Sequence, residues 1–440
     1  MEVRRVNLWR SRLPNRERVE YWSRELRRFF SWQLAITGLN LLAGLLIIRF
    51  LPKGDYALYA IGFMTLSIFT DITDAGISPA VRALAGRHWG DRERMGSVVN
   101  TAVSFRKQVA LATALPVAAY ALWQFRLLEA GWGQALALTI VFGIGGLVGL
   151  ETSIYRVPAV FSRKVIELQR FDGYTAVAKV GLIVACGLVY PSAWLFAVLS
   201  VATLVIDWRL VKRLGASLIT RTAAVSREYR ATMVGLFRPN ILNSVFMAFQ
   251  GQIALLLAAL FGSASNVAEL SAMGKIGVVF TILGSFVSAY LAPEVSKAVT
   301  PRGVLAKAAL VIGLYLAAAA VVLGVAWLAP ELVLWVLGPK YANVEGVLLL
   351  YLSVAMVGLL RAQVHALCIS RGWVRGFFWY APVVLAAQAY GIWRGELGTL
   401  RGIVNFEALV TGVAFAVTAG VFAWEWWRYR GAYGLETARP

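Results

Sequence analysis

Hydrophobic stretches and polar connections alternate along the whole chain, and twelve of the stretches have the composition of a membrane-crossing helix. A helix needs about 20 mainly apolar residues to cross a hydrocarbon core about 30 Å thick. The stretches cover residues 29–51, 56–81, 108–125, 134–155, 174–189, 194–208, 239–261, 270–296, 308–329, 346–360, 376–393 and 403–427. The fifth, sixth and tenth are shorter than the others. The pattern predicts an all-α polytopic membrane protein with about twelve transmembrane helices.

The basic residues indicate on which side of the membrane each connection lies. Most of the 43 Lys and Arg residues fall in the amino-terminal arm, the carboxyl-terminal tail and every second connection. The other connections, with the helix ends beside them, carry six basic residues: Arg49, Lys53, Arg126, Lys340, Arg394 and Arg401. Because loops rich in Lys and Arg stay in the cytoplasm, we expect both termini to be cytoplasmic.

The composition argues against several classes of function. With 59% hydrophobic and 15% charged residues, the chain of 440 residues is too apolar for a soluble protein. The net charge of +20 is spread over loops between hydrophobic stretches, so anionic phospholipids are nearer partners than nucleic acid, which we do not expect to bind. The two cysteines are far apart, and neither histidine lies in a cluster of carboxylates or cysteines, so we expect no metal site and no cofactor.

The chain is expected to consist of two halves between a basic arm and a short tail. The arm, residues 1–28, holds nine arginines, and its hydrophobic residues recur at helical spacing. It is either an amphipathic helix on the inner membrane surface or a solvated tail that enforces the topology. The longest internal polar connection follows the sixth stretch. The expected parts are the arm at 1–28, a six-helix bundle at 29–210, a cytoplasmic linker at 211–238, a second six-helix bundle at 239–427 and a cytoplasmic tail at 428–440.

A weak internal repeat supports this division. A shift of 214 residues aligns Asp55 with Glu269 at one end of a stretch and Pro79 with Pro293 at the other. Six spans per half would make the halves parallel repeats. Transporters built from such repeats place their substrate path between the halves, near the bilayer midplane.

Two motifs resemble those of a known transporter family. The first is RFLPKGDYALYA at 49–60, followed by DAGI at 74–77 and AVRALA at 80–85. The second is LGPKYA at 337–342, which leads into VLLLYL at 347–352. Their order and spacing resemble the polysaccharide-exporter, O-antigen flippase-like branch of the multidrug/oligosaccharidyl-lipid/polysaccharide (MOP) flippase superfamily. Tyr56, Gly76 and Arg82 fall on the family's helix-end motif, whereas Ala57 replaces its usual glycine.

The resemblance implies a fold, a function and a location. It implies two six-helix bundles forming a V that opens alternately to each side of a bacterial or archaeal inner membrane. The implied substrate is an undecaprenyl-pyrophosphate-linked oligosaccharide used in polysaccharide or lipopolysaccharide (O-antigen) biosynthesis, and other polysaccharide-assembly proteins are possible partners. Such a protein is not an enzyme, and the short outer connections are also less suited to a catalytic site.

Two carboxylates in the second stretch are candidates for coupling to H⁺ or Na⁺. Asp71 and Asp74 are three residues apart and share one face of a helix. A charged group inside a membrane usually faces a bundle interior or water. The alternative is structural: Asp74 caps or orients the helix end, with Arg82 as its candidate partner.

Two lysines inside hydrophobic stretches depart from the pattern of basic loops. Lys179 and Lys275 are candidates to bind the pyrophosphate of a substrate in a cavity, since an ammonium group offers several donors. Alternatively, each extends to a membrane interface, with Lys179 near the inner end and Lys275 near the outer end of its stretch.

Segment seven, residues 239–261, is unusually polar for a membrane span. Asn243 and Gln250 are seven residues apart, share a face and could line an oligosaccharide path. Hydrogen bonds between helices explain them nearly as well. Weaker candidates, most of them expected to form interhelical pairs, are Glu151, Arg156, Gln388 and Glu407. Gly143, Gly145, Gly146 and Gly149 in segment four should permit close helix packing.

Three functions remain open from these patterns. The first is a flippase for a lipid-linked oligosaccharide. The second is a cation-coupled multidrug exporter of the same superfamily, with which Asp71 is compatible. The third is a membrane polysaccharide polymerase or ligase, which would be expected to carry a large outer loop with catalytic basic residues.

Overall fold

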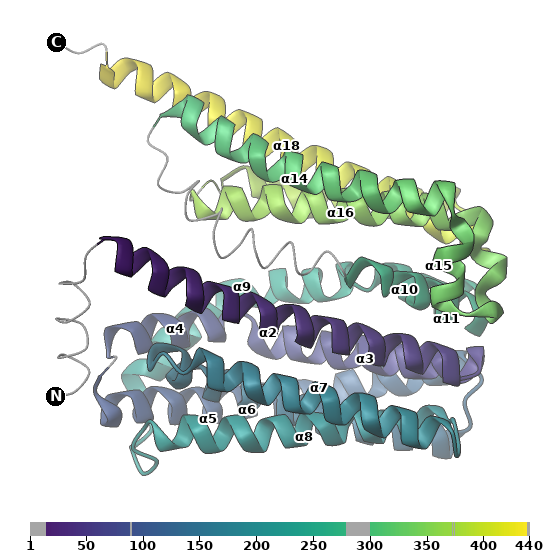
Figure 1. Ribbon diagram of the computed structural model, residues 1–440, viewed down its shortest axis with the longest axis horizontal. Helices are drawn as coiled ribbons and strands as arrows, with labels where there is room; N and C mark the ends of the chain where they lie inside the picture. Colours follow the sequence, from purple (N-terminus) through teal and green to yellow (C-terminus); the bar gives the residue numbers. More distant parts are fainter. Residues whose placement is uncertain (1–14, 89, 279–299, 372, 374, 438–440) are drawn as a thin grey trace.

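A computed structural model describes residues 15–88, 90–278, 300–371, 373 and 375–437, which are almost entirely helical (Figure 1). The first half contains α2 (Asn15–Phe50), α3 (Lys53–Asp74), α4 (Ile77–Arg87), α5 (Arg92–Leu127), α6 (Trp132–Phe161), α7 (Val165–Gly187) and α8 (Ala193–Ser217). The second half begins with α9 (Arg227–Gln250), α10 (Ile253–Phe261), α11 (Ala264–Gly274) and the 3₁₀ turn η1 (Ile276–Val278). It continues with α14 (Pro301–Leu328), α15 (Pro330–Leu337), η3 (Pro339–Val344), α16 (Glu345–Ser370), η4 (Arg375–Trp379), α17 (Tyr380–Arg394) and α18 (Leu400–Thr437).

The all-α polytopic fold predicted from the hydrophobic pattern is confirmed. Each of the twelve predicted stretches coincides with a helix, although much of the eighth, 270–296, lies outside the described residues. Within the described part, eight helices are long and apolar enough to cross a membrane, or nine if α9 and α10 form one bent span. The helices α7, α11 and α17 fall short of that criterion over the same part of the chain.

Two of the predicted spans are interrupted. The second stretch breaks after α3, where Ala75 has φ 23° and Gly76 has φ 93°. A side chain at Gly76 would also approach the Leu236 carbonyl of α9 to 3.3 Å, so glycine suits both the backbone conformation and the close packing. The seventh stretch bends by 55° between α9 and α10, at Gly251 and Gln252.

Several helices continue beyond the predicted spans on the side of the molecule where α2 begins and α18 ends. Residues 15–28 of the arm continue directly into the first span as one helix, α2, while residues 1–14 lie outside the described part. The predicted linker at 211–238 is mostly helical, because α8 runs to Ser217 and α9 begins at Arg227. Only the short segment between them is a true connection.

The halves approach each other at one end of the molecule and separate toward the other. In Figure 1, α14, α16 and α18 run together and diverge from α2 toward the end where α2 begins and α18 ends. We call this the inner end, following the sidedness expected from the basic loops, and the opposite one the outer end. At the outer end α11 packs on α3, and α15 packs on α2. The ribbon therefore forms a V that narrows toward the outer end.

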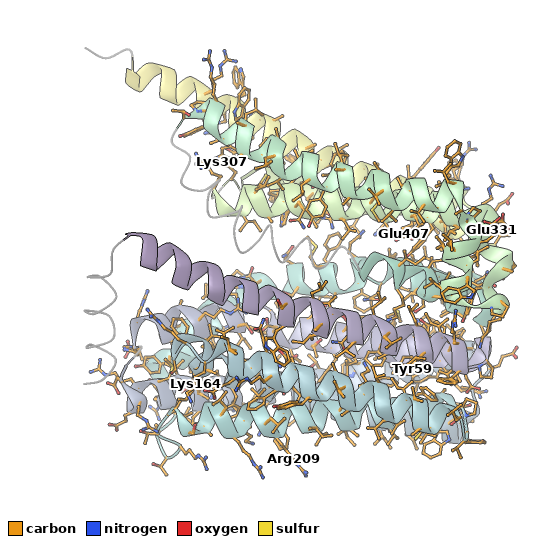
Figure 2. The ribbon with its side chains drawn as sticks, in the orientation of Figure 1. Tyr59, Lys164, Arg209, Lys307, Glu331 and Glu407 are labelled. Carbon is orange, nitrogen blue, oxygen red and sulfur yellow. The ribbon has the colours of Figure 1, made fainter. Side chains whose placement is uncertain are left out.

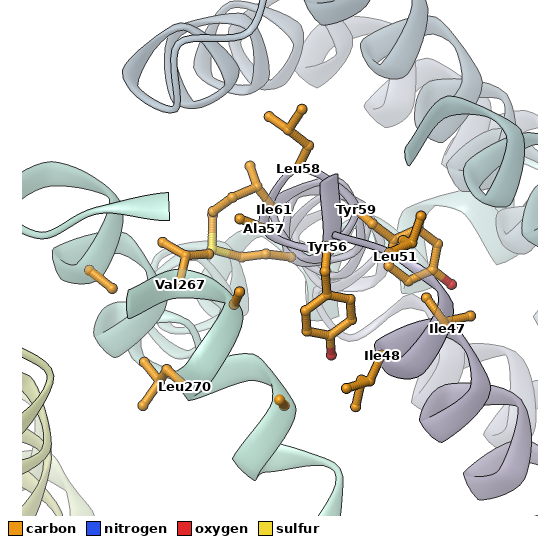
Figure 3. Packing of buried hydrophobic residues seen from close by; sticks show 14 of the residues in the cluster. Ile47, Ile48, Leu51, Tyr56, Ala57, Leu58, Tyr59, Ile61, Val267 and Leu270 are labelled. Carbon is orange, nitrogen blue, oxygen red and sulfur yellow. The ribbon is translucent and has the colours of Figure 1, made fainter. Parts of the chain in front are cut away.

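The centre of the V is packed by residues from both halves. Tyr56, Ile61 and neighbouring residues of α3 contact Val267 and Leu270 of α11 in one buried cluster (Figure 3). The two helices that the 214-residue shift aligns thus pack on each other. Because lipid tails are as apolar as these side chains, close packing rather than exclusion of water holds such helices together.

Glycines allow the closest approaches within the first half. A Cβ atom at Gly146 would lie 2.6 Å from the Phe69 ring, and one at Gly145 would lie 3.0 Å from Leu66 and Val201 side chains. These positions of α6 face α3 and α8, as the glycine-rich pattern predicted. Gly143 faces open space instead.

Candidate functional site

A polar cavity of about 370 Å³ lies between the two halves. The first half lines it with α2, α3 and α7, and the second with α11 and the α9–α10 bend. Its polar and aromatic lining residues are Asn40, Tyr56, Tyr59, Phe63, Lys179, Gln252, Ser271 and Lys275. Figure 2 shows Tyr59 inside the molecule, between the middle and the outer end. The cavity therefore lies where the V is narrow.

The cavity contains one lysine from each half. Lys179 belongs to α7, and Lys275 follows the last residue of α11, where the helix gives way to the 3₁₀ turn η1. The stem of Lys275 passes over Gly44, since a Cβ there would lie 3.6 Å from its Cδ. The ammonium of Lys179 lies 5.8 Å from the centre of the Phe63 ring. Both candidate phosphate-binding residues thus face one cavity.

Packing of α7 on α2 explains how Lys179 reaches the cavity. Gly173 lies against the Trp32 ring and Gly187 against the Phe50 ring, so small residues on both sides of Lys179 bring the helices together. Lys179 is eight residues before Gly187, or about 12 Å from the outer end of α7 at 1.5 Å per residue. The expectation that Lys179 lies near the inner end is therefore wrong. Lys275 is at a similar depth, eleven residues after Ala264.

The two ammonium groups have no carboxylate partner among the described residues. Neither Lys179 nor Lys275 forms an ion pair or a hydrogen bond with any residue in the described ranges. Both side chains are partly buried. Like charges in a region of low dielectric repel each other and lose hydration, so the cavity is suited to an anion that would neutralise them.

Tyrosines and serines tie the cavity wall together. The Tyr56 hydroxyl lies 3.3 Å from Ser271 Oγ across the interface between the halves. The Tyr59 hydroxyl lies 3.0 Å from Ser200 Oγ within the first half. Tyr56, predicted only as part of a helix-end motif, thus lines the cavity and contacts the opposite half.

An ion pair closes the outer side of the cavity. The Lys53 ammonium at the start of α3 donates to Glu269 Oε1 at 2.6 Å and to Asn343 Oδ1 at 3.2 Å. Within the second half, Glu269 Oε1 also accepts from Asn343 Nδ2 at 2.7 Å and from Ser265 Oγ at 2.8 Å. Glu269 is buried, with 3% of its side chain exposed, and Lys53 is 25% exposed. The first half therefore contributes the cation and the second half a preorganised carboxylate.

A second set of contacts joins the halves beside this pair. Lys340 donates to the backbone carbonyls of Arg49 at 2.9 Å and Leu51 at 2.5 Å. Arg49 in turn donates to the Trp335 carbonyl and stacks over the Trp335 ring, 4.9 Å from its centre. Three of the six outer basic residues thus hold the outer ends of the halves together. We call Lys53, Glu269, Asn343, Lys340, Arg49 and Trp335 the outer closure.

The carboxylates of α3 lie away from the cavity. Asp74 Oδ1 accepts from the Ser78 backbone N–H at 3.1 Å and hydroxyl at 2.6 Å, and it pairs with Arg106 at 3.4 Å. The geometry agrees with the structural alternative for Asp74, but its basic partner is Arg106 rather than Arg82. Arg82 is exposed on α4, and Asp71 is exposed on α3.

The two amides predicted to line a path, Asn243 and Gln250, are not among the residues that line the cavity. Gln250 accepts a hydrogen bond from Gln388 of α17, so it forms the interhelical pair that was the alternative to a path-lining role. Asn243 is exposed on α9. Gln252, two residues beyond Gln250, faces the cavity because the helix bends there. Because the helix bends here, Gln252 points into the cavity, whereas the predicted residues Asn243 and Gln250 point elsewhere.

Other charged residues within the first half form interhelical pairs, as expected. Arg156 of α6 pairs with Asp172 of α7 at 2.5 Å and with Asp207 of α8 at 3.0 Å. Glu151 of α6 accepts from Lys212 of α8 at 2.8 Å and from the Trp208 indole at 3.0 Å. No group of His, Cys, Asp and Glu side chains suited to a metal ion occurs among the described residues.

Comparison with known proteins relates this geometry to a transporter fold. No protein-family model and no curated protein sequence matches the chain. Among solved structures, the inward-facing conformation of a multidrug resistance MATE family transporter of the MOP superfamily matches with a TM-score of 0.65. The two share 16% identity over 92% of this chain and 96% of that one. The lipid II flippase MurJ, in an inward closed conformation, matches with a TM-score of 0.70 and 11% identity over 89% of this chain and 86% of that one.

The chain has the fold of MOP superfamily transporters. An outward-facing structure of a multidrug resistance MATE family transporter matches less well, with a TM-score of 0.56 and 17% identity over 92% of this chain and 94% of that one. The better fit to the inward-facing structure agrees with a V that narrows at the outer end. The superfamily fold expected from the motifs is thus confirmed, whereas its O-antigen flippase-like branch stays a prediction.

Proposed function

We propose that the protein is a flippase that moves a lipid-linked oligosaccharide across the membrane by alternating access. The substrate class is an amphiphile with a pyrophosphate between its lipid and its glycan, as in undecaprenyl-pyrophosphate-linked sugars. The glycan would serve in the synthesis of a surface polysaccharide or lipopolysaccharide. The protein then acts as a carrier that makes or breaks no bond in its substrate.

The observation that carries this proposal is the pair of lysines, Lys179 and Lys275, that face one cavity from opposite halves without a carboxylate partner in the described chain. Each ammonium has three donors for phosphate oxygens, and hydrogen bonds to charged groups contribute about 1.5–3 kcal/mol each. A pyrophosphate would offset the mutual repulsion of the lysines. Because one lysine belongs to each half, an anion held between them would also respond to movement of the halves.

The conformation supports a role in alternating access. The outer closure joins the halves at one end of the cavity, while the helices diverge toward the inner end (Figure 1). A substrate entering from the inner leaflet would reach the lysines in this state. Rupture of the Lys53–Glu269 pair and of the Lys340 contacts would then open the outer side.

The electrostatics of the cavity favour this reading over a cation-coupled multidrug exporter. An organic cation would meet two ammonium groups, and Asp71, the carboxylate that made this alternative attractive, is not among the cavity residues. This comparison of the flippase with the multidrug exporter does not depend on whether H⁺ or Na⁺ is the coupling ion.

Reconstitution in liposomes tests the proposal. The probe is a fluorescent, short-chain polyprenyl-pyrophosphate-linked sugar, and its movement between leaflets is followed by chemical quenching of the outer leaflet. The double variant Lys179→Gln/Lys275→Gln should lower the initial rate at least tenfold. The control Lys164→Gln removes a lysine of the inner surface, where Lys164 is 38% exposed and pairs with its neighbour Glu167 (Figure 2). It should keep the wild-type rate.

Two results would decide against the proposal. One is an unchanged rate in the folded double variant. The other is transport of a cationic dye such as ethidium without movement of the pyrophosphate probe, which would establish the multidrug-exporter alternative. Monodisperse gel filtration of each variant before reconstitution separates loss of transport from loss of folding.

A further inference from the structure

Two of the six outer basic residues form no ion pair or hydrogen bond within the described chain. Arg49, Lys53 and Lys340 belong to the outer closure. Arg126 donates to the Ala130 carbonyl at the end of its own helix and stacks over the Trp132 ring. The remaining two, Arg394 at the end of α17 and Arg401 in the first turn of α18, form no ion pair or hydrogen bond with the described residues. Arg394 only lies over the ring of its neighbour Trp393, 6.0 Å from the ring centre. Basic residues are disfavoured on the outer side, so two unpaired arginines there need another explanation.

Arg394 and Arg401 line the same pocket. It has a volume of about 520 Å³ and lies between the outer ends of α17 and α18. Asn405 adds an amide to its wall, and Glu396 is the one carboxylate among its lining residues. Glu396 makes no ion pair with either arginine, so the lining keeps an excess of one positive charge.

The loop between the two arginines is held in place by the protein. The Leu397 side chain is buried, and the Gly398 carbonyl accepts a hydrogen bond from Asn266 Nδ2 at 3.2 Å. The Glu396 carbonyl lies against the first turn of α18, only 1.9 Å from where a Cβ of Gly402 would be. Gly402 in turn donates its backbone N–H to the Thr399 hydroxyl at 3.0 Å. The spacing of Arg394 and Arg401 is therefore set before any ligand binds.

Aromatic side chains place this pocket at the level of lipid headgroups. Tyr390 and Trp393 are 51% and 78% exposed on the last turns of α17, with ring centres 6.2 Å apart. Exposed Trp and Tyr residues gather where the hydrocarbon core meets the headgroups. An anion in the pocket would thus lie at the depth of the phosphates of the outer leaflet.

We propose that Arg394 and Arg401 form a binding site for the phosphate group of an amphiphile in the outer leaflet. Guanidinium groups match phosphate oxygens with parallel donors and are less strongly hydrated than ammonium groups, which suits a site at the membrane interface. The amphiphile comes either from the bilayer, as an anionic phospholipid, or from a polyprenyl phosphate. The site is separate from the central cavity, and its occupancy does not require transport.

Site-specific photo-cross-linking tests this site in the full-length protein. The photoreactive residue p-benzoylphenylalanine replaces exposed Tyr390 at the pocket wall, and the protein is reconstituted in phosphatidylcholine with either phosphatidylglycerol or undecaprenyl phosphate. Mass spectrometry then gives the ratio of anionic to zwitterionic adducts. We expect enrichment of an anionic adduct, which falls at least tenfold in Arg394→Gln/Arg401→Gln. The probe that is enriched identifies the source of the phosphate.

Two further variants make the test specific. Arg87→Gln/Arg302→Gln removes the same charge from exposed positions near the inner end and should leave the enrichment unchanged. Gly402→Ala keeps both arginines but displaces the Glu396 carbonyl, and it should lower the enrichment. Equal enrichment in wild type and Arg394→Gln/Arg401→Gln would overturn the proposal. So would binding of inorganic phosphate, dependent on both arginines, without enrichment of either amphiphile.

Discussion

Replacement of Lys53 by methionine should shift the protein from the inward-facing toward the outward-facing conformation. Methionine keeps the length of the side chain but removes the cation that pairs with Glu269 across the halves. In the closed state Glu269 would keep its bonds to Asn343 and Ser265 but lose its counter-charge. In the proposed outward-facing state this pair is broken, so that state would lose nothing.

The structure sets the size of this effect. A hydrogen bond to a charged group contributes about 1.5–3 kcal/mol. Because Lys53 is 25% exposed, water screens the pair, and the lower limit of about 1.5 kcal/mol is appropriate. That energy corresponds to about a tenfold change in the ratio of the two conformations.

Distances between spin labels at the outer ends of the two halves measure this ratio. Labels on Gly133→Cys and Glu331→Cys, in a background without the native Cys186 and Cys368, report the separation of the halves. Gly133 has open space for a side chain, and Glu331 is exposed at the outer end (Figure 2). We expect the distance distribution of Lys53→Met to gain a longer component.

Two variants serve as controls for the spin-label experiment. Arg126→Gln removes an outer charge whose contacts lie within the first half, so its distances should match the wild type. The exchange Lys53→Glu/Glu269→Lys should restore the short distance. A wild-type distribution in folded Lys53→Met would refute the role of this pair in closure.

Three further predictions concern stability, each read from thermal unfolding in detergent. Asp74→Ala should destabilise the protein by about 2–3 kcal/mol, because it leaves the guanidinium of Arg106, 4% exposed, without its carboxylate; the 34% exposure of Asp74 keeps the loss below that of a fully buried pair. An unchanged midpoint would contradict this role. Gly146→Val should cost about 1–3 kcal/mol through overpacking, whereas Gly143→Val, in open space, should cost far less, and equal losses would refute the packing argument. Asp91 caps α5, and the backbone N–H of Arg94, with that of Glu93, holds its pKa below the ordinary value. The stability that Asp91 contributes should be fully present above the ordinary Asp pKa and disappear as the pH falls through the lowered pKa. The unfolding midpoint of Asp91→Asn should therefore fall less steeply toward acid pH than that of the wild type. Equally steep pH dependence in both proteins would contradict the capping role of Asp91.

The hydrophobic pattern was sufficient to predict the helices but not their interruptions. Apolar length alone determines where a chain can cross a membrane, and a helix is found at each predicted stretch. The break at Gly76 depends on the approach of α9, whose carbonyl at Leu236 comes within 3.3 Å of a Cβ built there. That contact joins residues far apart in the sequence, so the hydrophobic pattern does not contain it. The end of a helix at Gly76 was indicated only by the family's helix-end motif.

The candidate site was predictable where a residue departed from a rule. Lys179 and Lys275 stood out as cations inside apolar stretches, and both face the central cavity. Gln250 and Asn243 carry no charge, and the direction in which each side chain points depends on the rotation of its helix, which the sequence does not specify. Gln250 bonds to α17, whereas Gln252 lines the cavity.

The outer closure was visible in the sequence only as scattered exceptions to the charge pattern. The sequence places Arg49, Lys53 and Lys340 only as basic residues of the outer side. Their contacts with Trp335, Glu269 and backbone carbonyls require the two halves to be placed side by side. The alignment of Asp55 with Glu269 indicated the outer ends of the two helices that contact each other. It did not show that Lys53 is the residue that pairs with Glu269.

An electron cryomicroscopy map of the protein with a short-chain polyprenyl pyrophosphate tests the central claim most directly. The account predicts density for the pyrophosphate between the ammonium groups of Lys179 and Lys275, and its absence in Lys179→Gln/Lys275→Gln. Pyrophosphate density elsewhere in the protein, with the space between the two lysines unoccupied, would contradict it.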